Sequence, residues 1–486
     1  MDVVYIIAPA LLIAVVLASV WLERFSVPVI LVALGAGILF GSDVLELWHF
    51  DDVQLTNQVA NLALVFILFH GGFVTKREDF RAVALPAGGL ATWGVILTAI
   101  VTFAVLHLAL GWSYELALLL SVIISSTDAA AIFSILRRQS LPRKLSSTVE
   151  IESAANDPMA ILLTLIGVTA VASGEPFGWE TAVLFAWKFA GGPLLGYALA
   201  RGAIALFNWI KPQDRGYYYV LFLGVVMLTY GLVELVQASG MLAVFAAGFV
   251  MGNRAFIHKQ GVTNFSEAIS TIANIGMFVM MGLVVFPRTW GTLWLEGTLL
   301  FLVITFISRP VAVFLGTVGM KIPFRGRLFT SWAGLRGAVP IVLATYPAAA
   351  GLEIGDRIFN LVFFAVILSI VVQGSSLPLI AKWLKLSVPA RPQPLFNLEL
   401  ITMAATDYDL VVVELPDAQG AEGARIRDLD LPEGAVITMI SRGREVVLPK
   451  GNTRLRGGDH VTVLAHAPDL GAVRTALLDP FLAKGS

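Results

Sequence analysis

About 13 apolar stretches, most of them close to 20 residues long, follow one another along the first 390 residues of the chain. A helix of about 20 apolar residues crosses the hydrocarbon core of a bilayer and satisfies its own backbone hydrogen bonds there. The pattern therefore predicts an all-α polytopic membrane protein with about 13 transmembrane helices. Residues 59–73 and 241–253 are short or weak stretches, so about 12 or 14 crossings stay open as alternatives.

The composition agrees with a membrane protein and excludes several other classes. Hydrophobic residues make up 57% of the chain and charged residues 14%, whereas soluble proteins carry about 25% charged residues. The net charge of −1 provides no basic excess, so no nucleic acid partner is expected. The chain has no cysteine, which excludes disulfides, thiolate metal sites and cysteine nucleophiles. Residues 1–4 lack the basic start of a signal peptide, so the first stretch is expected to remain as a crossing.

The distribution of charge divides the chain into parts. Charged residues are about twice as frequent after residue 390 as before it. We expect a transmembrane domain at residues 1–390, a proline-containing linker at 391–400 and a small α/β domain at 401–486. Lys and Arg gather in alternate loops, so the positive-inside rule places the N-terminus outside and the C-terminal domain in the cytoplasm. The expected location is the inner or plasma membrane of a prokaryote-like cell.

Two of the predicted helices are interrupted by polar or glycine-containing segments. Ser125-Ser126-Thr127-Asp128 interrupts the fifth stretch, and residues 334–337 (Gly-Leu-Arg-Gly) interrupt the twelfth. One interrupted helix in each half of a membrane protein is typical of a transporter whose ion site lies near the bilayer midplane. Because the two stretches are seven crossings apart, they are expected to enter the membrane from opposite sides, as in inverted repeats.

Four ionisable residues fall where lipid or helix packing is expected. Such a group costs at least about 2.5–3.5 kcal/mol in the middle of a bilayer, so each one needs a partner or a function. The four are Asp128, Glu152, Asp157 and Arg336. Arg336 cannot lose its charge and needs a carboxylate, and we expect Glu152 to pair with it. Arg309, also deep in its helix, is an alternative partner that the sequence leaves open.

Asp157 is then the acid without a partner. At about 100° per residue, Ser153 shares a helix face with Asp157, whereas Glu152 lies about 140° away. Burial favours the protonated form of a carboxyl group, so Asp157 is expected to hold either a proton or a hard monovalent cation, but not both. Oxygen ligands that suit such a cation are expected from Ser153, Asn156, Thr127 and Asp128.

The chain resembles the NhaP-type cation/proton antiporters at three motifs. These are residues 125–129 (SSTDA), 152–158 (ESAANDP) and 334–338 (GLRGA), and the resemblance covers roughly the first 390 residues. It implies that Asp157 carries the ion and the proton, assisted by Thr127, Asp128 and Ser153. It also implies core-stabilising roles for Asn156, Glu152 and Arg336. A homodimer, an elevator-like moving core and electroneutral exchange are further implications of the resemblance.

One position departs from the pattern of these antiporters. An acid usually precedes a Gly-Gly pair in the third helix, where this chain has His70 before Gly71 and Gly72. Neutral imidazole is a poor ligand for an alkali cation, and protonated imidazole repels one. The site therefore has fewer anionic ligands, or His70 senses pH. A plain hydrogen bond between helices is an equal alternative for His70.

The C-terminal residues resemble the second half of the regulatory domains of potassium transporters and channels, the TrkA-C or RCK-C type. Strands are predicted at residues 410–415, 435–440, 445–449 and 457–465. The resemblance implies pairing of such domains and a small-molecule ligand. No glycine-rich nucleotide fingerprint follows a strand, so NAD is not an expected ligand.

Together, these features predict a secondary antiporter that exchanges K⁺ (or Na⁺) for H⁺ and is regulated by its cytoplasmic tail. The combination resembles the potassium/proton, cell-volume-regulation branch of the antiporters. An Na⁺(Li⁺)/H⁺ antiporter is the first alternative, and a regulated potassium channel is a second, although the chain lacks a Thr-Val-Gly-Tyr-Gly filter. An intramembrane hydrolase has no supporting motif, so no enzymatic activity and no cofactor are expected.

Overall fold

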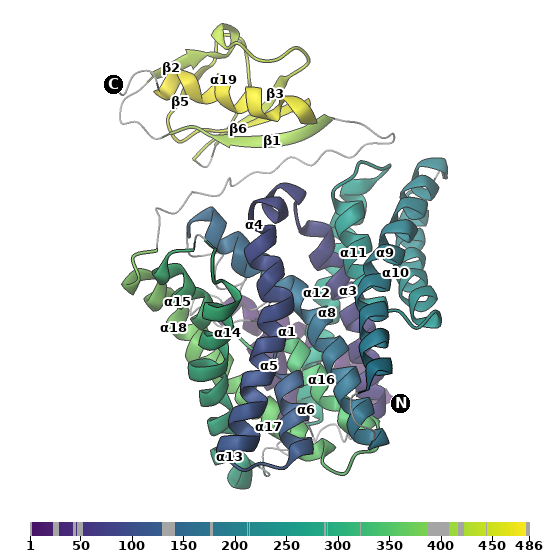
Figure 1. Ribbon diagram of the computed structural model, residues 1–486. Coiled ribbons are helices and arrows are strands. Elements are labelled where there is room, and N and C mark those ends of the chain that lie inside the picture. The colour runs from purple at the N-terminus through teal and green to yellow at the C-terminus, as the bar shows by residue number, and fades with distance from the viewer. Residues whose placement is uncertain are drawn as a thin grey trace. The chain divides into compact units, whose positions relative to one another are not determined.

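The computed structural model describes residues 2–22, 29–41, 45, 52–128, 141–174, 178–210, 212, 214–285, 288, 290–320, 322–386, 408–416, 422–443 and 445–482. The predicted linker at 391–400 and the last residue of the first motif, Ala129, lie outside the described residues. The chain divides into two compact units, and the C-terminal sheet belongs to the second (Figure 1).

Most of the described chain is helical, as the apolar stretches predict. Within the described ranges, eight helical spans are long and apolar enough to cross a membrane. They are α3 (Val53–Val74), α4 to η3 (Arg77–Ala109), α8 (Arg143–Ser173), α9 (Trp179–Trp209), α10 (Gly216–Leu235), α12 (Lys259–Leu283), α13 to α14 (Trp290–Gly316) and α17 to α18 (Gly355–Trp383). Shorter apolar helical stretches are Ala8–Leu22 of α1 (Asp2–Leu22), α2 (Val29–Phe40), α6 (Tyr114–Ile123), α11 (Gly240–Gly252) and α16 (Ala338–Ala349).

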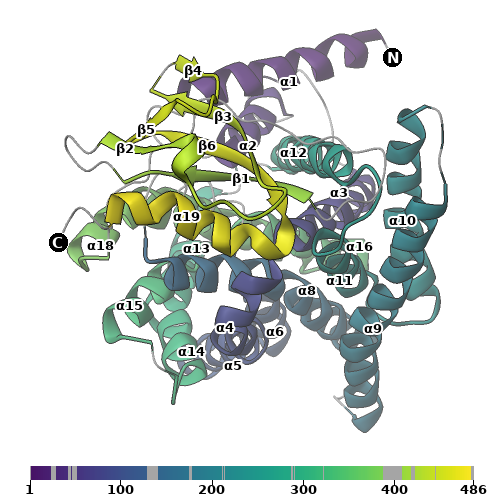
Figure 2. The same cartoon turned by 90° about the horizontal axis from the view of Figure 1, so that it is seen from above.

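Figure 2 views the bundle along its helices and shows α3 close to α11 and α16. Glycines allow the approach of α3 to α11. A Cβ on Gly72 of α3 would overlap the carbonyl oxygen of Phe245, and one on Gly252 of α11 would overlap that of Phe73. Small residues let membrane helices pack backbone to backbone in this way. The Gly-Gly pair after His70 therefore has a packing role at Gly72.

The second interrupted helix is broken where the sequence predicts, and the first ends at the predicted polar segment. The first, α6, ends at Ile123, and residues 124–128 are not helical. The second consists of α15 (Phe324–Trp332) and α16, with residues 333–337 between them. π-Helical segments, which recur at functional sites, lie next to these breaks in η5 (Ile304–Ser308) and η6 (Ser369–Gly374).

The C-terminal domain is a small antiparallel sheet with one helix on its face. The strands β1 (Tyr408–Glu414), β6 (His460–His466), β3 (Val436–Arg442) and β4 (Glu445–Val447) pair in the order β1-β6-β3-β4. A separate ribbon joins β2 (Glu422–Arg425) to β5 (Arg454–Arg456). The helix α19 (Leu470–Leu482) packs Val473, Leu477 and Phe481 onto the apolar side of the sheet. The four predicted strands correspond to the main sheet, whereas β2, β5 and α19 were not predicted.

A buried ion pair holds the strands of this domain together. The carboxylate of Asp459 is fully buried and accepts two hydrogen bonds of 2.8 Å from Arg442 on β3. It also accepts one from the backbone N–H of Arg456 on β5, at 2.8 Å. The bond to Asp459 raises the pKa of Arg442, so the pair keeps its positive partner throughout the physiological pH range.

Replacing Arg442 with methionine tests this ion pair, because it leaves the buried Asp459 charge without its partner. We expect a loss of about 2 kcal/mol in local stability, since part of the arginine side chain reaches solvent. Hydrogen–deuterium exchange of the β6 amides in the full chain should then accelerate about 30-fold. Arg427→Met is the matched control, because the Arg427–Asp428 pair is more than half exposed. Equal exchange in the two variants would contradict a stabilising role of the buried pair.

Candidate ion-binding site

The two broken helices meet through their non-helical segments. The backbone N–H of Asp128 donates to the carbonyl oxygen of Leu335 at 2.8 Å. The Asp128 carboxylate accepts from the backbone N–H of Ala338, the first residue of α16, at 3.3 Å. A carboxylate at a helix N-terminus is stabilised by the partial positive charge of the first amides. Asp128 thus connects the non-helical segment after α6 to the start of α16.

Arg336 connects the breaks in the other direction. Its Nη1 donates to the backbone carbonyl of Ser125 at 2.9 Å and also to that of Ser126. Its own backbone N–H donates to Ser369 Oγ, in η6, at 3.0 Å. The helix α6 ends at Ile123, just before the residues that carry these carbonyls. The guanidinium therefore satisfies the backbone of the first break.

The predicted pair of Arg336 with Glu152 is wrong. Glu152, which is fully buried on α8, forms its ion pair with Arg309, and the distance from Nη2 to Oε2 is 2.7 Å. The physical reason is that Arg336 lies beside the carbonyls of Ser125 and Ser126, which accept from its Nη1, whereas Arg309 lies beside Glu152. Arg309 directly follows η5, and Ser308 at the end of that segment accepts a hydrogen bond from Thr102 at 2.9 Å. The alternative partner left open by the sequence is the observed one.

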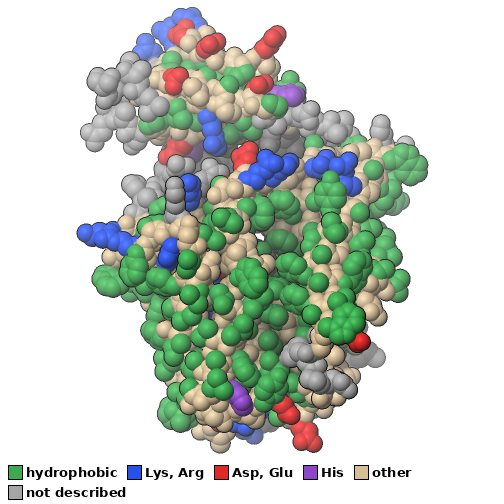
Figure 3. Space-filling model, in the orientation of Figure 1, with side chains coloured by type: hydrophobic (Ala, Val, Ile, Leu, Met, Phe, Trp, Pro, Cys, Tyr) green, Lys and Arg blue, Asp and Glu red, His purple; other side chains and the backbone are tan. Residues whose placement is uncertain are grey.

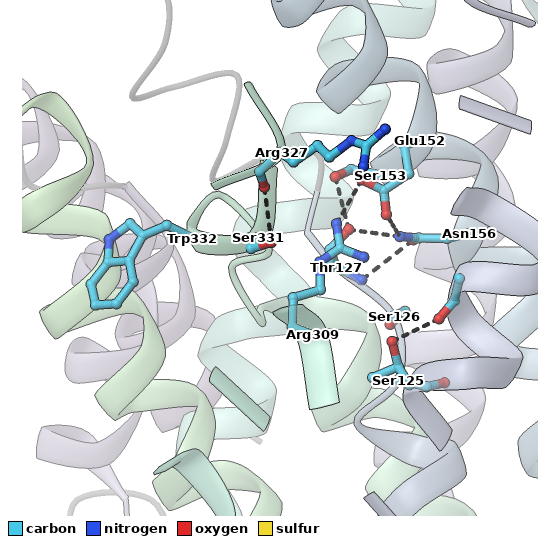
Figure 4. A network of polar contacts seen from close by, with 12 residues as sticks. Ser125, Ser126, Thr127, Glu152, Ser153, Asn156, Arg309, Arg327, Ser331 and Trp332 are labelled. Carbon is cyan, nitrogen blue, oxygen red and sulfur yellow. Dashed lines mark hydrogen bonds and ion pairs between the residues drawn. The ribbon is translucent and has the colours of Figure 1, made fainter. Parts of the chain in front are cut away.

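The polar residues of α8 form a network with the first break. Figure 4 shows Thr127, Ser153, Asn156 and Glu152 pointing toward one another. The hydroxyl groups of Thr127 and Ser153 are 2.8 Å apart, and Asn156 Nδ2 donates to Thr127 Oγ1 at 2.6 Å. Asn156 Nδ2 also donates to Glu152 Oε1 at 3.3 Å, and Asn156 Oδ1 accepts from the backbone N–H of Thr127 at 3.4 Å. Asn156 therefore ties the ion pair to the hydroxyl cluster.

Asp157 differs from the other acids of the site. Its side chain is only 7% exposed, and its Oδ1 atom has no hydrogen-bond partner in the described part of the chain. Asp128 and Glu152 are its acidic neighbours. A buried carboxylate without a hydrogen bond is costly unless a proton or a cation occupies it. Asp157 is therefore a buried acid of the site with a side-chain oxygen that the described residues leave unbonded.

Among the described residues, the charges buried around the two breaks do not sum to zero. Across the described helices, the ionisable side chains buried around the breaks are three acids and two bases, namely Asp128, Glu152, Asp157, Arg309 and Arg336. With all five ionised, the formal charge is −1. One proton or one monovalent cation on the site makes it neutral.

Two glycines of the second break provide room for these charged groups. A Cβ on Gly334 would overlap the side chain of Arg309, and one on Gly337 would overlap the carboxylate of Asp128. The break is anchored further by Gln373, which accepts from Ser369 Oγ at 2.5 Å and donates to the carbonyl of Trp332 at 3.1 Å. Ser369 and Gln373 were not identified from the sequence. The sequence did contain a signal for them, because a serine and a glutamine lie four residues apart in an otherwise apolar helix.

His70 lies on α3 and contacts a different helix. Its Nδ1 is 3.1 Å from the hydroxyl group of Ser266 on α12. This contact agrees with the alternative of a hydrogen bond between helices. The role of His70 as a pH sensor stays a prediction.

Comparison with protein families gives two matches, one before and one after the point near residue 390 where charged residues become more frequent. Residues 10–383 match the family model described as "Sodium/hydrogen exchanger, transmembrane", and residues 410–478 match the TrkA-C domain. Both resemblances predicted from the motifs are confirmed.

Two K(+)/H(+) antiporters match nearly the whole chain, and a solved antiporter structure has a similar fold. The K(+)/H(+) antiporter NhaP2 of Shewanella oneidensis is 35% identical over 472 residues, which is 96% of this chain and 81% of that protein. The K(+)/H(+) antiporter NhaP of Alkalimonas amylolytica is 33% identical over 465 residues, covering 95% and 81% of the two chains. The sodium proton antiporter MjNhaP1 of Methanocaldococcus jannaschii has a similar fold, with a TM-score of 0.68 at 22% identity over 79% of this chain and 99% of that chain.

The ion pair of Glu152 with Arg309 can be tested by a double-mutant cycle. Glu152→Gln and Arg309→Met each leave a buried charge without a partner, so each should cost about 3–5 kcal/mol of stability. The double variant should lose much less than the sum of the two. Thermal denaturation of the detergent-solubilised protein measures all three. Arg336→Met is the comparison, and stronger coupling of Glu152→Gln to Arg336→Met than to Arg309→Met would refute the assignment.

Proposed function

Because this chain belongs to the sodium/hydrogen exchanger family, we propose that it exchanges K⁺ or Na⁺ for H⁺ by competition of the two at Asp157. The observation that carries this proposal is the buried Asp157 carboxyl group with an unbonded oxygen. A proton and an alkali cation are alternative ways to neutralise it. Binding of one therefore displaces the other, which is the requirement for exchange.

The arrangement of the other groups supports specific roles. Thr127 and Ser153 offer hydroxyl oxygens within one hydrogen-bonded cluster, and Asp128 places a second carboxylate beside Asp157. Oxygen ligands of this kind suit alkali cations. Asn156, Glu152 and Arg336 bind backbone or side-chain groups of the site and serve to stabilise the core.

The charge of the site predicts the stoichiometry. The five buried groups carry a formal charge of −1 when no ion is bound. The site is neutral with one proton and neutral with one K⁺ or Na⁺. Only neutral forms cross the low-dielectric interior at low cost, so one cation is exchanged for one proton and no net charge moves.

We favour K⁺ as the cation because two relatives that cover most of the chain are named K(+)/H(+) antiporters. Na⁺ remains the alternative, since the Na(+)/H(+) antiporter NhaS2 of Synechocystis is 27% identical over 366 residues, which is 72% of this chain and 67% of that protein. A role in cell-volume regulation accompanies the K⁺ assignment.

The proposed architecture is a homodimer with inverted repeats and about 13 crossings per chain. The eight long helices and the five shorter apolar helices of the described chain support this number. We propose domain limits of 1–390 and 401–486, with a linker between them, an outside N-terminus and a cytoplasmic regulatory domain. Its TrkA-C match supports control by a small-molecule ligand.

Asp157→Asn tests the competition directly. The substitution removes the charge for which the two ions compete, and the site is then neutral without either. We expect cation-dependent proton movement in proteoliposomes to fall to the level of empty liposomes, while the melting temperature in detergent is retained. Glu115→Gln, at an exposed acid of α6, is the control and should leave exchange unchanged. Exchange by Asp157→Asn at the parent rate would disprove the proposal.

A further inference from the structure

A second polar cluster lies between α3 and α16, and the proposed ion site does not use it. Asn57 Nδ2 donates to Thr345 Oγ1 at 2.7 Å, and Asn61 Nδ2 donates to Asn57 Oδ1 at 2.9 Å. The hydroxyl group of Tyr346 donates to Asn61 Oδ1. We call these four residues the α3–α16 clasp. The chain of hydrogen bonds leaves α16 at Tyr346, passes through both asparagines of α3 and returns to α16 at Thr345.

The hydrogen bonds and the residue types of the clasp differ from those of the proposed ion site. The side-chain oxygen of each asparagine accepts one of the bonds, and Thr345 Oγ1 accepts from Asn57 while donating to the carbonyl of Val342 at 2.7 Å. The clasp also contains no carboxylate, whereas Asp128 and Asp157 both belong to the proposed ion site. The clasp instead holds two helices in one relative position.

The clasp is placed at the far end of the half-helix that starts at the ion site. The N–H of Ala338 contacts Asp128, and Thr345 follows seven residues later. At 1.5 Å per residue, this places the clasp about 10 Å from the site along α16. The non-helical residues 333–337 before α16 give this half-helix a joint at its other end.

The charge pattern indicates the side of the membrane on which the clasp lies. Asn57 is near the start of α3, whereas Lys76 and Arg77 follow its end. Figure 3 shows Lys and Arg side chains near the end of the helical part where α4 begins, and acidic side chains at the opposite end. In the proposed orientation, the basic end is cytoplasmic. The clasp therefore lies toward the outside.

A third helix places a negative charge near the clasp. Tyr230 and Glu234 of α10 are electrostatic neighbours of Tyr346, and the Glu234 carboxylate accepts the backbone N–H of Gly240 at 2.8 Å. Asn57, Asn61 and Tyr346 are partly exposed, whereas Thr345 is fully buried. The surroundings of the clasp are thus polar and include one acid, Glu234.

We propose that the α3–α16 clasp is the closure on the outer side of the ion site, and that it must open before Asp157 can exchange ions with the outside. This inference rests on the proposed function, because alternating access is required only of a transporter. Each hydrogen bond lost from the clasp shifts the population toward the open form by about fivefold, which corresponds to about 1 kcal/mol.

A cysteine reporter can measure this opening because the chain has no cysteine of its own. Val342 is fully buried and lies one helical turn from Tyr346 on the same face, nearer the ion site. We expect Val342→Cys to react slowly with a membrane-impermeant thiol reagent added to the outside of intact cells. Adding Tyr346→Phe, which removes one hydroxyl group and keeps the ring, should accelerate this reaction about fivefold. Tyr114→Phe, at an exposed tyrosine of α6, is the matched control and should not change the rate.

The outcomes separate the closure from a purely structural role and from the proposed function. Reagent applied from the cytoplasmic side of inverted vesicles should show no acceleration with Tyr346→Phe. Equal labelling with and without Tyr346→Phe would overturn the closure, as would acceleration from both sides. If Tyr346→Phe does not fold, Asn57→Ala breaks a different link of the clasp and gives the same test. If neither the parent nor the Val342→Cys protein exchanges cations for protons, the proposed function is contradicted. The side-specific labelling still tests the clasp in that case.

Discussion

A carboxylate buried in a low-dielectric interior must be neutralised, and the surroundings of Asp157 follow from that constraint. An unpaired ion costs several kcal/mol to bury, even after the protein relaxes around it. The fold supplies partners for the other four buried charges from backbone amides, backbone carbonyls and one ion pair. Among the described residues it leaves Oδ1 of Asp157 without a hydrogen-bond partner, and the proposed function assigns the balance of this charge to a mobile ion. In the proposed function, exchange depends on the net charge of these five groups. The hydrogen bonds and the ion pair of the other four groups keep that net charge constant.

Several local irregularities have a common purpose in this light. The two helix breaks provide unpaired carbonyls and amides, which Arg336 and Asp128 occupy from opposite sides. The glycines at 334 and 337 remove side chains that would collide with Arg309 and Asp128. The π-helical segment η5 ends directly before Arg309. The segment η6 begins at Ser369, whose hydroxyl oxygen accepts from the backbone N–H of Arg336. Each of these irregularities interrupts regular helical hydrogen bonding, and each brings a buried charged side chain or one of its hydrogen-bond partners to the site.

The sequence predicted the helical class, the two breaks and the residues that gather at them. Asp157, Ser153 and Thr127 could be found because polar groups in an apolar helix need a reason, and helical periodicity tells which of them share a face. The partner of Glu152 was predicted wrongly because both arginines need a counter-charge and the sequence does not contain the distances between helices. Arg336 instead donates from Nη1 to two backbone carbonyls, and a rule that pairs charge with charge does not consider such partners. In the C-terminal domain, β2 and β5 are short and polar, so they carry no alternating apolar pattern by which to identify them.

The central claim is that one proton and one cation are alternative occupants of the same buried charge. The most direct measurement is the number of protons released when K⁺ or Na⁺ is added to the detergent-solubilised protein in weakly buffered solution. The account predicts a release that saturates at about one proton per chain at a pH where the site is protonated, and none from the Asp157→Asn variant. Saturable cation binding with no proton release would contradict it, and so would an undiminished release from Asp157→Asn.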